Sequence, residues 1–204
     1  TQKILTARRE QFPTLRQYKG LSGFPKPHES EHDAFIAGHA SNSVSVALGM
    51  AKARTLLHGD YSVLALIGDG ALSGGLAYEG LNNAGSSGEP LIVILNDNEM
   101  SISKNVGALA RYLSSMRSSE GYVRTKKAVE RRLNRTAVIG PSVAKVIKNS
   151  KSVVRDVLLQ SATIFEDFGF VYLGPVDGHN LGDLEEALLA AKEYHRPVFL
   201  HVHT

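Results

Sequence analysis

The residues best suited to chemistry in this chain lie in two short polar turns, each directly after an apolar run. The triplet Gly-Asp-Gly at residues 68–70 follows the run at 62–67, and the triplet Asn-Asp-Asn at 96–98 follows the run at 91–95. Ligands of an open parallel sheet bind just beyond the carboxyl ends of its strands. Asp and Asn oxygens there are hard ligands of the kind Mg²⁺ prefers, and Mg²⁺ commonly binds together with a phosphate group. The turns therefore predict a site for Mg²⁺ and a diphosphate, which the glycines let main-chain N–H groups approach closely.

The pairing of the two turns is what favours a site over ordinary loops. Gly, Asp and Asn are common turn residues, so either triplet alone indicates only a turn. Residues 71–88 between them have the length of one helix. The chain therefore makes one strand–helix–strand crossover, which brings the two turns side by side.

The apolar patterning predicts the elements that would position these turns. Short unbroken apolar runs are typical of parallel strands buried on both faces, and a 3.6-residue apolar repeat is typical of helices. We expect strands at 62–67, 91–95, 170–173 and 198–203, and helices at 40–57, about 75–84 and 181–194. Strands that alternate with helices indicate an α/β fold with a doubly wound, mostly parallel sheet flanked by helices.

The remaining segments are expected to lie outside this sheet. Residues 1–31 are rich in Gly and Pro and predict an irregular surface loop, whereas residues from about 106 to 168 predict a long helical excursion. We expect one domain over residues 1–204 that is incomplete at both ends, because the chain starts without Met and stops directly after a strand.

Composition excludes several classes of function. The chain has no Cys, so disulfides, thiolate metal sites and a Cys nucleophile are excluded. No apolar run approaches the length of a membrane span, and no signal peptide is visible, which favours the cytoplasm. Residues 111–155 hold twelve Lys or Arg and two Glu. This basic block lacks interleaved aromatic residues and any nucleic-acid motif, so we expect a solvated helical face and no nucleic-acid partner.

Longer phrases around the two turns resemble the 1-deoxy-D-xylulose-5-phosphate synthase family, a branch of the transketolase-like thiamine diphosphate enzymes. The resemblance runs essentially from end to end of the chain. The phrases that carry it are LSGFP (21–25), ESE (29–31), GH (38–39), GDGA (68–71), LIVILNDNEMSIS (91–103), NVGAL (105–109) and GPVDGH (174–179).

The resemblance implies a reaction as well as a fold. Members of this family are transferases that join pyruvate to glyceraldehyde 3-phosphate with loss of CO₂, and the five-carbon product serves isoprenoid, thiamine and pyridoxal biosynthesis. They use thiamine diphosphate and Mg²⁺, and they form homodimers of a longer, three-domain chain. The glutamate that activates the cofactor and the groups that bind the sugar phosphate are then expected outside residues 1–204.

The resemblance also assigns roles to individual residues. The implied Mg²⁺ ligands are Asp69, Asn98 and the main-chain oxygen of Met100. The implied contacts to the diphosphate and thiazolium are Gly38, His39, Ala40, Gly70 and Ala71, joined by Asn98 through its amide. The side chains are consistent with these roles, since an Asn amide can place its oxygen on a metal and its NH₂ on a phosphate.

Two features of the phrase at residues 38–40 leave its role open. His39 is a candidate catalytic residue that could donate to phosphate or substrate, or it is only a polar residue at the entry of a helix. Ala40 stands where the family usually has Ser, so any contact there must come from the backbone.

Other interpretations remain open from the residues alone. Residues 68–73 nearly match the G-x-G-x-x-G fingerprint of dinucleotide-binding domains, failing only at Ser73. That fold places an acidic residue at the end of the second strand, where this chain has Asn96. Another transketolase-like thiamine diphosphate enzyme and a non-catalytic domain that keeps the fold are further alternatives. His201 and His203, two apart on one strand, could form a metal pair, whereas His179 is expected to fix a turn and has a site role only as an alternative.

Overall fold

The computed structural model describes residues 2–36, 38–98, 108, 111–113 and 163–204, and a parallel sheet lies at its centre. The four strands run in the order β1-β2-β4-β3, and every neighbouring pair is parallel. Their bounds are β1 (Leu64–Gly68), β2 (Ile92–Asp97), β3 (Val171–Asp177) and β4 (Val198–His203). The predicted α/β fold with a parallel sheet is therefore confirmed.

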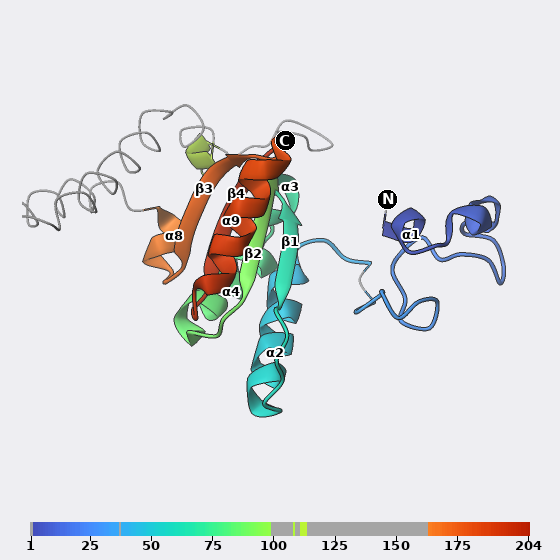
Figure 1. The fold of residues 1–204 in the computed structure, drawn as a ribbon, viewed down its shortest axis with the longest axis horizontal. Coiled ribbons are helices and arrows are strands. Elements are labelled where there is room, and N and C mark those ends of the chain that lie inside the picture. The colour runs from blue at the N-terminus through green and yellow to red at the C-terminus, as the bar shows by residue number, and fades with distance from the viewer. Residues whose placement is uncertain (1, 37, 99–107, 109–110, 114–162) are drawn as a thin grey trace, which may run out of the picture.

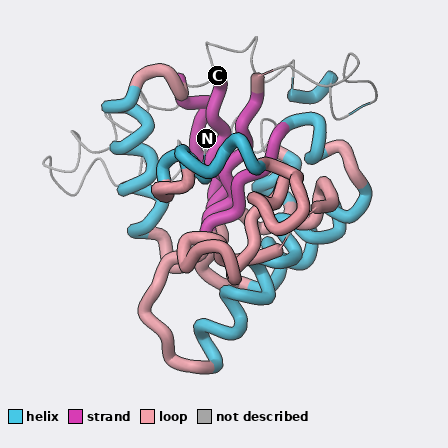
Figure 2. The backbone as a smooth tube through the Cα atoms, turned by 90° about the vertical axis from the view of Figure 1, so that its right-hand side faces the viewer, coloured by secondary structure: helices cyan, strands magenta, loops and turns pink. Residues whose placement is uncertain are grey.

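Helices cover both faces of this sheet (Figure 1). On one face, α2 (Ser43–Leu56) and α4 (Gly75–Ser87) pack in a core that also holds Phe165 of α8 (Ile164–Asp167). On the other face, α9 (Leu181–Glu193) packs on β3 and β4 through a smaller cluster. Figure 2 shows helices on either side of the strands.

The two faces of β1 differ in exposure, which corrects the expectation that this run is buried on both faces. Ala65 and Ile67 are 3% exposed and pack in the larger core, whereas Leu64 and Leu66 are 49% and 68% exposed. Leu64 and Leu66 are exposed because β1 is the outermost strand of the sheet, whereas α9 packs on β3 and β4 at the other side. β1 therefore has only one face covered by the described residues.

Two segments also differ from the sequence expectation, and a third lies mostly outside the described residues. Residues 1–31 are not wholly irregular, since they contain α1 (Gln2–Leu5) and the 3-10 helix η1 (Arg9–Thr14). Such short helices carry too little apolar repeat to be recognised. β3 continues past Pro175 to Asp177, with a shift in register between Leu173 and Val176. The expected helical excursion at 106–168 and the basic block at 111–155 lie mostly outside the described residues.

Charged side chains hold the N-terminal segment together. The guanidinium of Arg8 donates two hydrogen bonds of 2.7 Å to the carboxylate of Asp33, and Lys3 forms an ion pair with Glu29. The amide of Lys26 donates to the same Asp33 carboxylate at 2.8 Å. Hydrogen bonds from Arg8 hold the pKa of Asp33 well below its usual range, although burial of the carboxylate opposes this shift. Figure 1 shows this segment lying beside the sheet domain.

The Arg8–Asp33 pair predicts that acid loosens the N-terminal segment. A carboxyl with a lowered pKa in the folded state stabilises that state above its ordinary pKa of about 4 and loses this contribution as the pH falls through the lowered value. We expect Asp33→Asn to speed hydrogen exchange at the Lys26 amide at pH 7, with the difference from wild type shrinking below about pH 4. The exposed Glu10→Gln is the matched control. Equal exchange rates for wild type and Asp33→Asn at pH 7 would contradict the assignment.

One glycine in α4 marks the closest backbone contact between this helix and the segment before β3. A Cβ added at Gly85 would lie 2.1 Å from the main-chain oxygen of Phe168, whereas one added at Gly75 of the same helix meets nothing within 4 Å. We therefore expect Gly85→Ala to destabilise the protein by about 1–3 kcal/mol, the usual cost of overpacking. Gly75→Ala should leave stability unchanged or slightly raised. Chemical denaturation of both variants checks this, and equal stability for the two would refute it.

Candidate functional site

The two polar turns meet at the carboxyl edge of the sheet. β1 ends at Gly68, which pairs with Asn96 of the neighbouring strand β2. The chain passes from Gly68 directly into the one-turn helix α3 (Asp69–Leu72), and Asn98 follows the last residue of β2. Asp69 and Asn98 therefore reach the same edge from adjacent parallel strands, as the predicted crossover requires.

The two side chains differ in their access to solvent. Asp69 is 4% exposed, whereas Asn98 is exposed at the surface. Among residues that the structure describes, no group of three or more His, Cys, Asp or Glu could hold a metal ion by itself. Mg²⁺ typically takes one or two protein oxygens and completes its shell with phosphate oxygens and water. This donor set therefore fits Mg²⁺ carried by a diphosphate better than a metal site built from protein alone.

A second segment joins this edge through Ser41. The Ser41 hydroxyl donates a 2.7 Å hydrogen bond to the main-chain oxygen of Ala71, thirty residues further along the chain. Ser41 has a φ of 72°, a conformation that non-glycine residues rarely adopt and that is found more often at functional sites. Gly38, His39 and Ala40 precede it and are exposed. The two segments expected to contact the diphosphate are thus held beside each other.

A separate one-turn helix precedes the helix expected at about 75–84. Gly70 and Ala71 lie in this four-residue α3, and α4 begins at Gly75 as expected. A helix of one turn has few aligned peptide groups, so it lacks the strong dipole that a long helix would direct at an anion. What it offers is main-chain N–H groups, because the first turn of a helix has no acceptors within the helix for them.

A buried chain of hydrogen bonds between three side chains lies in the sheet next to Asn98. His201 Nε2 lies 3.0 Å from Asp97 Oδ2, and His201 Nδ1 lies 2.8 Å from the hydroxyl of Tyr172. Both nitrogens of this ring are therefore occupied, and the interpretation of His201 with His203 as a metal pair is wrong. Sequence reasoning missed this chain of hydrogen bonds, since Asp97, His201 and Tyr172 lie on three different strands.

The remaining candidates are placed as follows. The turn after β3 is closed by a hydrogen bond from the backbone N–H of His179 to the carboxylate of Asp177, so His179 takes part in this turn through its main chain. Gly178 donates to the main-chain oxygen of His203 at 2.8 Å. Met100, the third implied Mg²⁺ ligand, lies outside the described residues.

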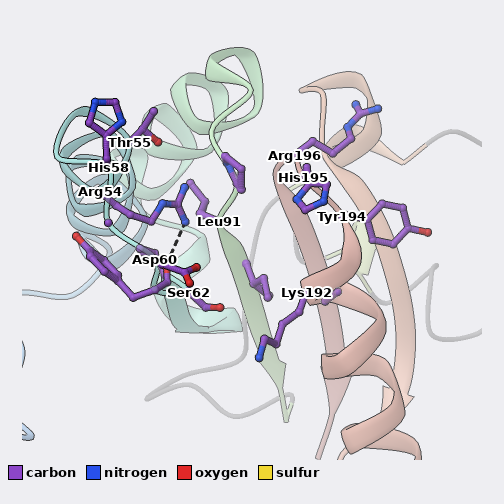
Figure 3. A pocket seen from close by; sticks show the side chains of 16 residues that line it. Arg54, Thr55, His58, Asp60, Ser62, Leu91, Lys192, Tyr194, His195 and Arg196 are labelled. Atoms are coloured by element: carbon purple, nitrogen blue, oxygen red, sulfur yellow. Dashed lines mark hydrogen bonds between the residues drawn. The ribbon is translucent and has the colours of Figure 1, made fainter.

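A large cavity lies at the opposite edge of the sheet, where the strands begin. It has a volume of about 790 Å³ and is lined by residues at and beyond the C-terminal ends of α2 and α9, among them Arg54, His58, Lys192 and Arg196. Figure 3 shows these side chains around an open hollow, with Arg54 donating to the main-chain oxygen of Tyr61. None of the predicted metal or cofactor residues lines it. The donor chemistry therefore favours the carboxyl edge over this cavity.

The sequence of this chain is similar to that of 1-deoxy-D-xylulose-5-phosphate synthases. The family model for 1-deoxy-D-xylulose-5-phosphate synthase matches residues 1–204. Proteins named 1-deoxy-D-xylulose-5-phosphate synthase from Syntrophomonas wolfei and Natranaerobius thermophilus are 54% and 53% identical over 202 residues. Each match covers 99% of this chain but only 32% of the relative, so the chain spans about a third of their length.

A solved structure has the same fold at lower sequence similarity. Transketolase from Campylobacter jejuni superposes with a TM-score of 0.57 and 21% sequence identity. The match covers 96% of this chain and 24% of the transketolase chain. Together with the parallel sheet and its two layers of helices, this likeness supports the doubly wound α/β fold.

Proposed function

The chain belongs to the 1-deoxy-D-xylulose-5-phosphate synthase family, and on that premise we propose that its full-length protein joins pyruvate to glyceraldehyde 3-phosphate. The reaction releases CO₂ and forms 1-deoxy-D-xylulose 5-phosphate, a precursor for isoprenoid and thiamine biosynthesis. Within that protein, residues 1–204 bind the Mg²⁺-diphosphate part of thiamine diphosphate. The observation that carries this proposal is the arrival of Asp69 and Asn98 at one sheet edge from adjacent parallel strands.

The residues of this edge have distinct tasks in the proposal. Asp69 supplies the negative charge for Mg²⁺, and Asn98 supplies an amide oxygen, with Met100 contributing its main-chain oxygen as the family resemblance implies. Thiamine diphosphate, when bound, would supply the carbanion stabilisation that the reaction needs. The protein would then have to bind and orient this cofactor. Main-chain N–H groups of Gly70 and Ala71 face the diphosphate.

The segment at residues 38–40 completes the binding residues of the proposal. Gly38 and Ala40 offer backbone groups to the cofactor, and His39 donates a hydrogen bond to phosphate or substrate as the candidate catalytic residue. The Ser41–Ala71 hydrogen bond supports this arrangement, because it holds the exposed segment against α3.

The wider properties in the proposal follow from the family. We propose a homodimer that acts in the cytoplasm on two small substrates, without a nucleic-acid or membrane partner. In the part of the chain that the structure describes, no helix is both long enough and apolar enough to span a membrane.

A dinucleotide-binding domain fits the edge less well. Such a domain needs an acidic residue at the end of the second strand to bind the ribose hydroxyls. β2 runs one residue past Asn96, where the sequence placed its end, and its last residue Asp97 is acidic but fully buried and hydrogen-bonded to His201. It is therefore unavailable to a nucleotide. Calorimetric titration of the full-length protein should show binding of thiamine diphosphate with Mg²⁺ and none of NAD, and the reverse result would favour the dinucleotide domain.

The enzymatic proposal is tested with the full-length protein. Pyruvate labelled at its carboxyl carbon should release labelled CO₂ over many turnovers only when glyceraldehyde 3-phosphate, thiamine diphosphate and Mg²⁺ are all present. Removal of Mg²⁺ with a chelator should abolish the release, and restored Mg²⁺ should recover it. CO₂ release that is indifferent to thiamine diphosphate or to the divalent ion would overturn the proposal.

A further inference from the structure

The structure contains a buried polar chain that the proposed binding residues do not use. His201 lies on β4, between β2 and β3, and its side chain is fully buried. Its two ring nitrogens join Asp97 at the end of β2 to Tyr172 on β3, at 3.0 and 2.8 Å. The Asp97 carboxylate can only accept, so Nε2 is the donor of that hydrogen bond, and Nδ1 is paired with a hydroxyl that can either donate or accept. One ring thus connects all three strands.

Packing fixes Tyr172, which is one end of this chain of hydrogen bonds. The Tyr172 ring stacks in parallel with those of Phe165 and Phe199, at centroid distances of 6.2 and 6.3 Å. Both phenylalanines are at most 1% exposed. Protein interiors are close-packed, so rings held this way have little freedom to shift. The position of His201 is therefore set by the aromatic core.

The carboxylate end of the chain lies beside the proposed Mg²⁺ ligand. Asp97 is fully buried, and a buried carboxylate is costly unless it is paired. Its main-chain oxygen also accepts a 3.0 Å hydrogen bond from the amide of Thr204. Asp97 is thus held through both its side chain and its main chain, and the next residue is Asn98. These two contacts hold the residue directly before Asn98.

We infer that His201 is a positioning residue for the metal site, acting through Asp97 to fix Asn98 in the orientation that binds Mg²⁺. This inference rests on the proposed function, because it takes Asn98 to be a ligand. His201 touches neither metal nor cofactor in this scheme. Removing a residue that orients a metal ligand typically weakens metal affinity about 10- to 100-fold.

Two substitutions separate the two hydrogen bonds of the ring. The Gln amide nitrogen can replace Nε2, so His201→Gln keeps a donor toward Asp97 and loses the contact with Tyr172. The shorter Asn amide corresponds to Nδ1, so His201→Asn keeps the contact with Tyr172 and loses the one with Asp97. Both remove one buried hydrogen bond, so both should lower the thermal unfolding midpoint of the full-length apoprotein, and His201→Asn should lower it more because it takes a donor from a buried carboxylate.

Cofactor affinity should distinguish the two variants. Calorimetric titration of the full-length protein with thiamine diphosphate at saturating Mg²⁺ should give an affinity about 10- to 100-fold weaker than wild type for His201→Asn. His201→Gln should bind close to wild type. The matched control is His203→Asn, which alters the exposed histidine two residues further along the same strand.

The outcomes separate this inference from the function it rests on. If wild type binds the cofactor and folded His201→Asn binds it equally well, the positioning role is overturned while the proposed function stands. Equal losses of affinity in His201→Asn and His201→Gln would show a merely structural role and also overturn it. If wild type does not bind thiamine diphosphate with Mg²⁺, the proposed function fails and the inference fails with it.

Discussion

Replacing Asp69 with Asn should weaken the binding of thiamine diphosphate to the full-length protein by tens- to several hundredfold at fixed Mg²⁺. The substitution preserves the size of the side chain and removes the only formal charge that we assign to the metal from this chain. Asp69 is 4% exposed, so water cannot readily replace the lost ligand. Loss of a charge-assisted contact in such a site costs on the order of 2–4 kcal/mol, which corresponds to the expected change in affinity.

A control at the other edge of the sheet sharpens this prediction. Asp60→Asn removes an equal charge from an exposed residue that lines the large cavity near the strand starts. Calorimetric titration should show wild-type affinity for Asp60→Asn and a large loss for Asp69→Asn. Wild-type affinity in Asp69→Asn would remove this residue from the site, and a selective loss in Asp60→Asn would move the site to the cavity.

The second large effect concerns activity of the segment alone. Residues 1–204 expressed by themselves should release no CO₂ from pyruvate and glyceraldehyde 3-phosphate, because the family resemblance places the cofactor-activating glutamate outside this range. The chain spans only 32% of its relatives' length, which supports this division. The segment should also associate with itself, since Leu64 and Leu66 of β1 are 49% and 68% exposed.

A side-by-side assay checks this second prediction. CO₂ release is measured for the isolated segment and for the full-length protein at equal concentrations, with saturating cofactor and Mg²⁺. Full-length turnover with a silent segment is the expected result. Robust turnover by the segment would show that an acid–base group for the cofactor lies within residues 1–204 and that we have misplaced it.

The positions of the two turns could be predicted because they depend on local rules. The run at 91–95 is long and apolar enough to indicate a buried strand, and β2 is found at Ile92–Asp97. The helix-length spacing between the turns then requires adjacent parallel strands, and the handedness of such crossovers leaves few alternatives. Asp69 and Asn98 could therefore be placed at one edge from the sequence alone.

The features that could not be predicted depend on contacts between distant residues. Asp97 and His201 are 104 residues apart, and no local pattern indicates that one accepts a hydrogen bond from the other. The bond from Ser41 to Ala71 spans thirty residues and depends on a positive φ that sequence does not reveal. The face of β1 that the described residues leave exposed follows from the order of strands in the sheet, which the apolar run at 62–67 does not encode.

The most direct test of the central claim is the location of the metal. Crystals of the full-length protein grown with thiamine diphosphate and Mn²⁺, which takes the same oxygen ligands as Mg²⁺, would locate the ion by its anomalous scattering. We predict one anomalous peak, for an ion bonded to the carboxylate of Asp69, the amide oxygen of Asn98 and the main-chain oxygen of Met100, with diphosphate oxygens among its other ligands. A peak that contacts neither residue, or a diphosphate bound in the cavity near Arg54 and Lys192, would contradict the account.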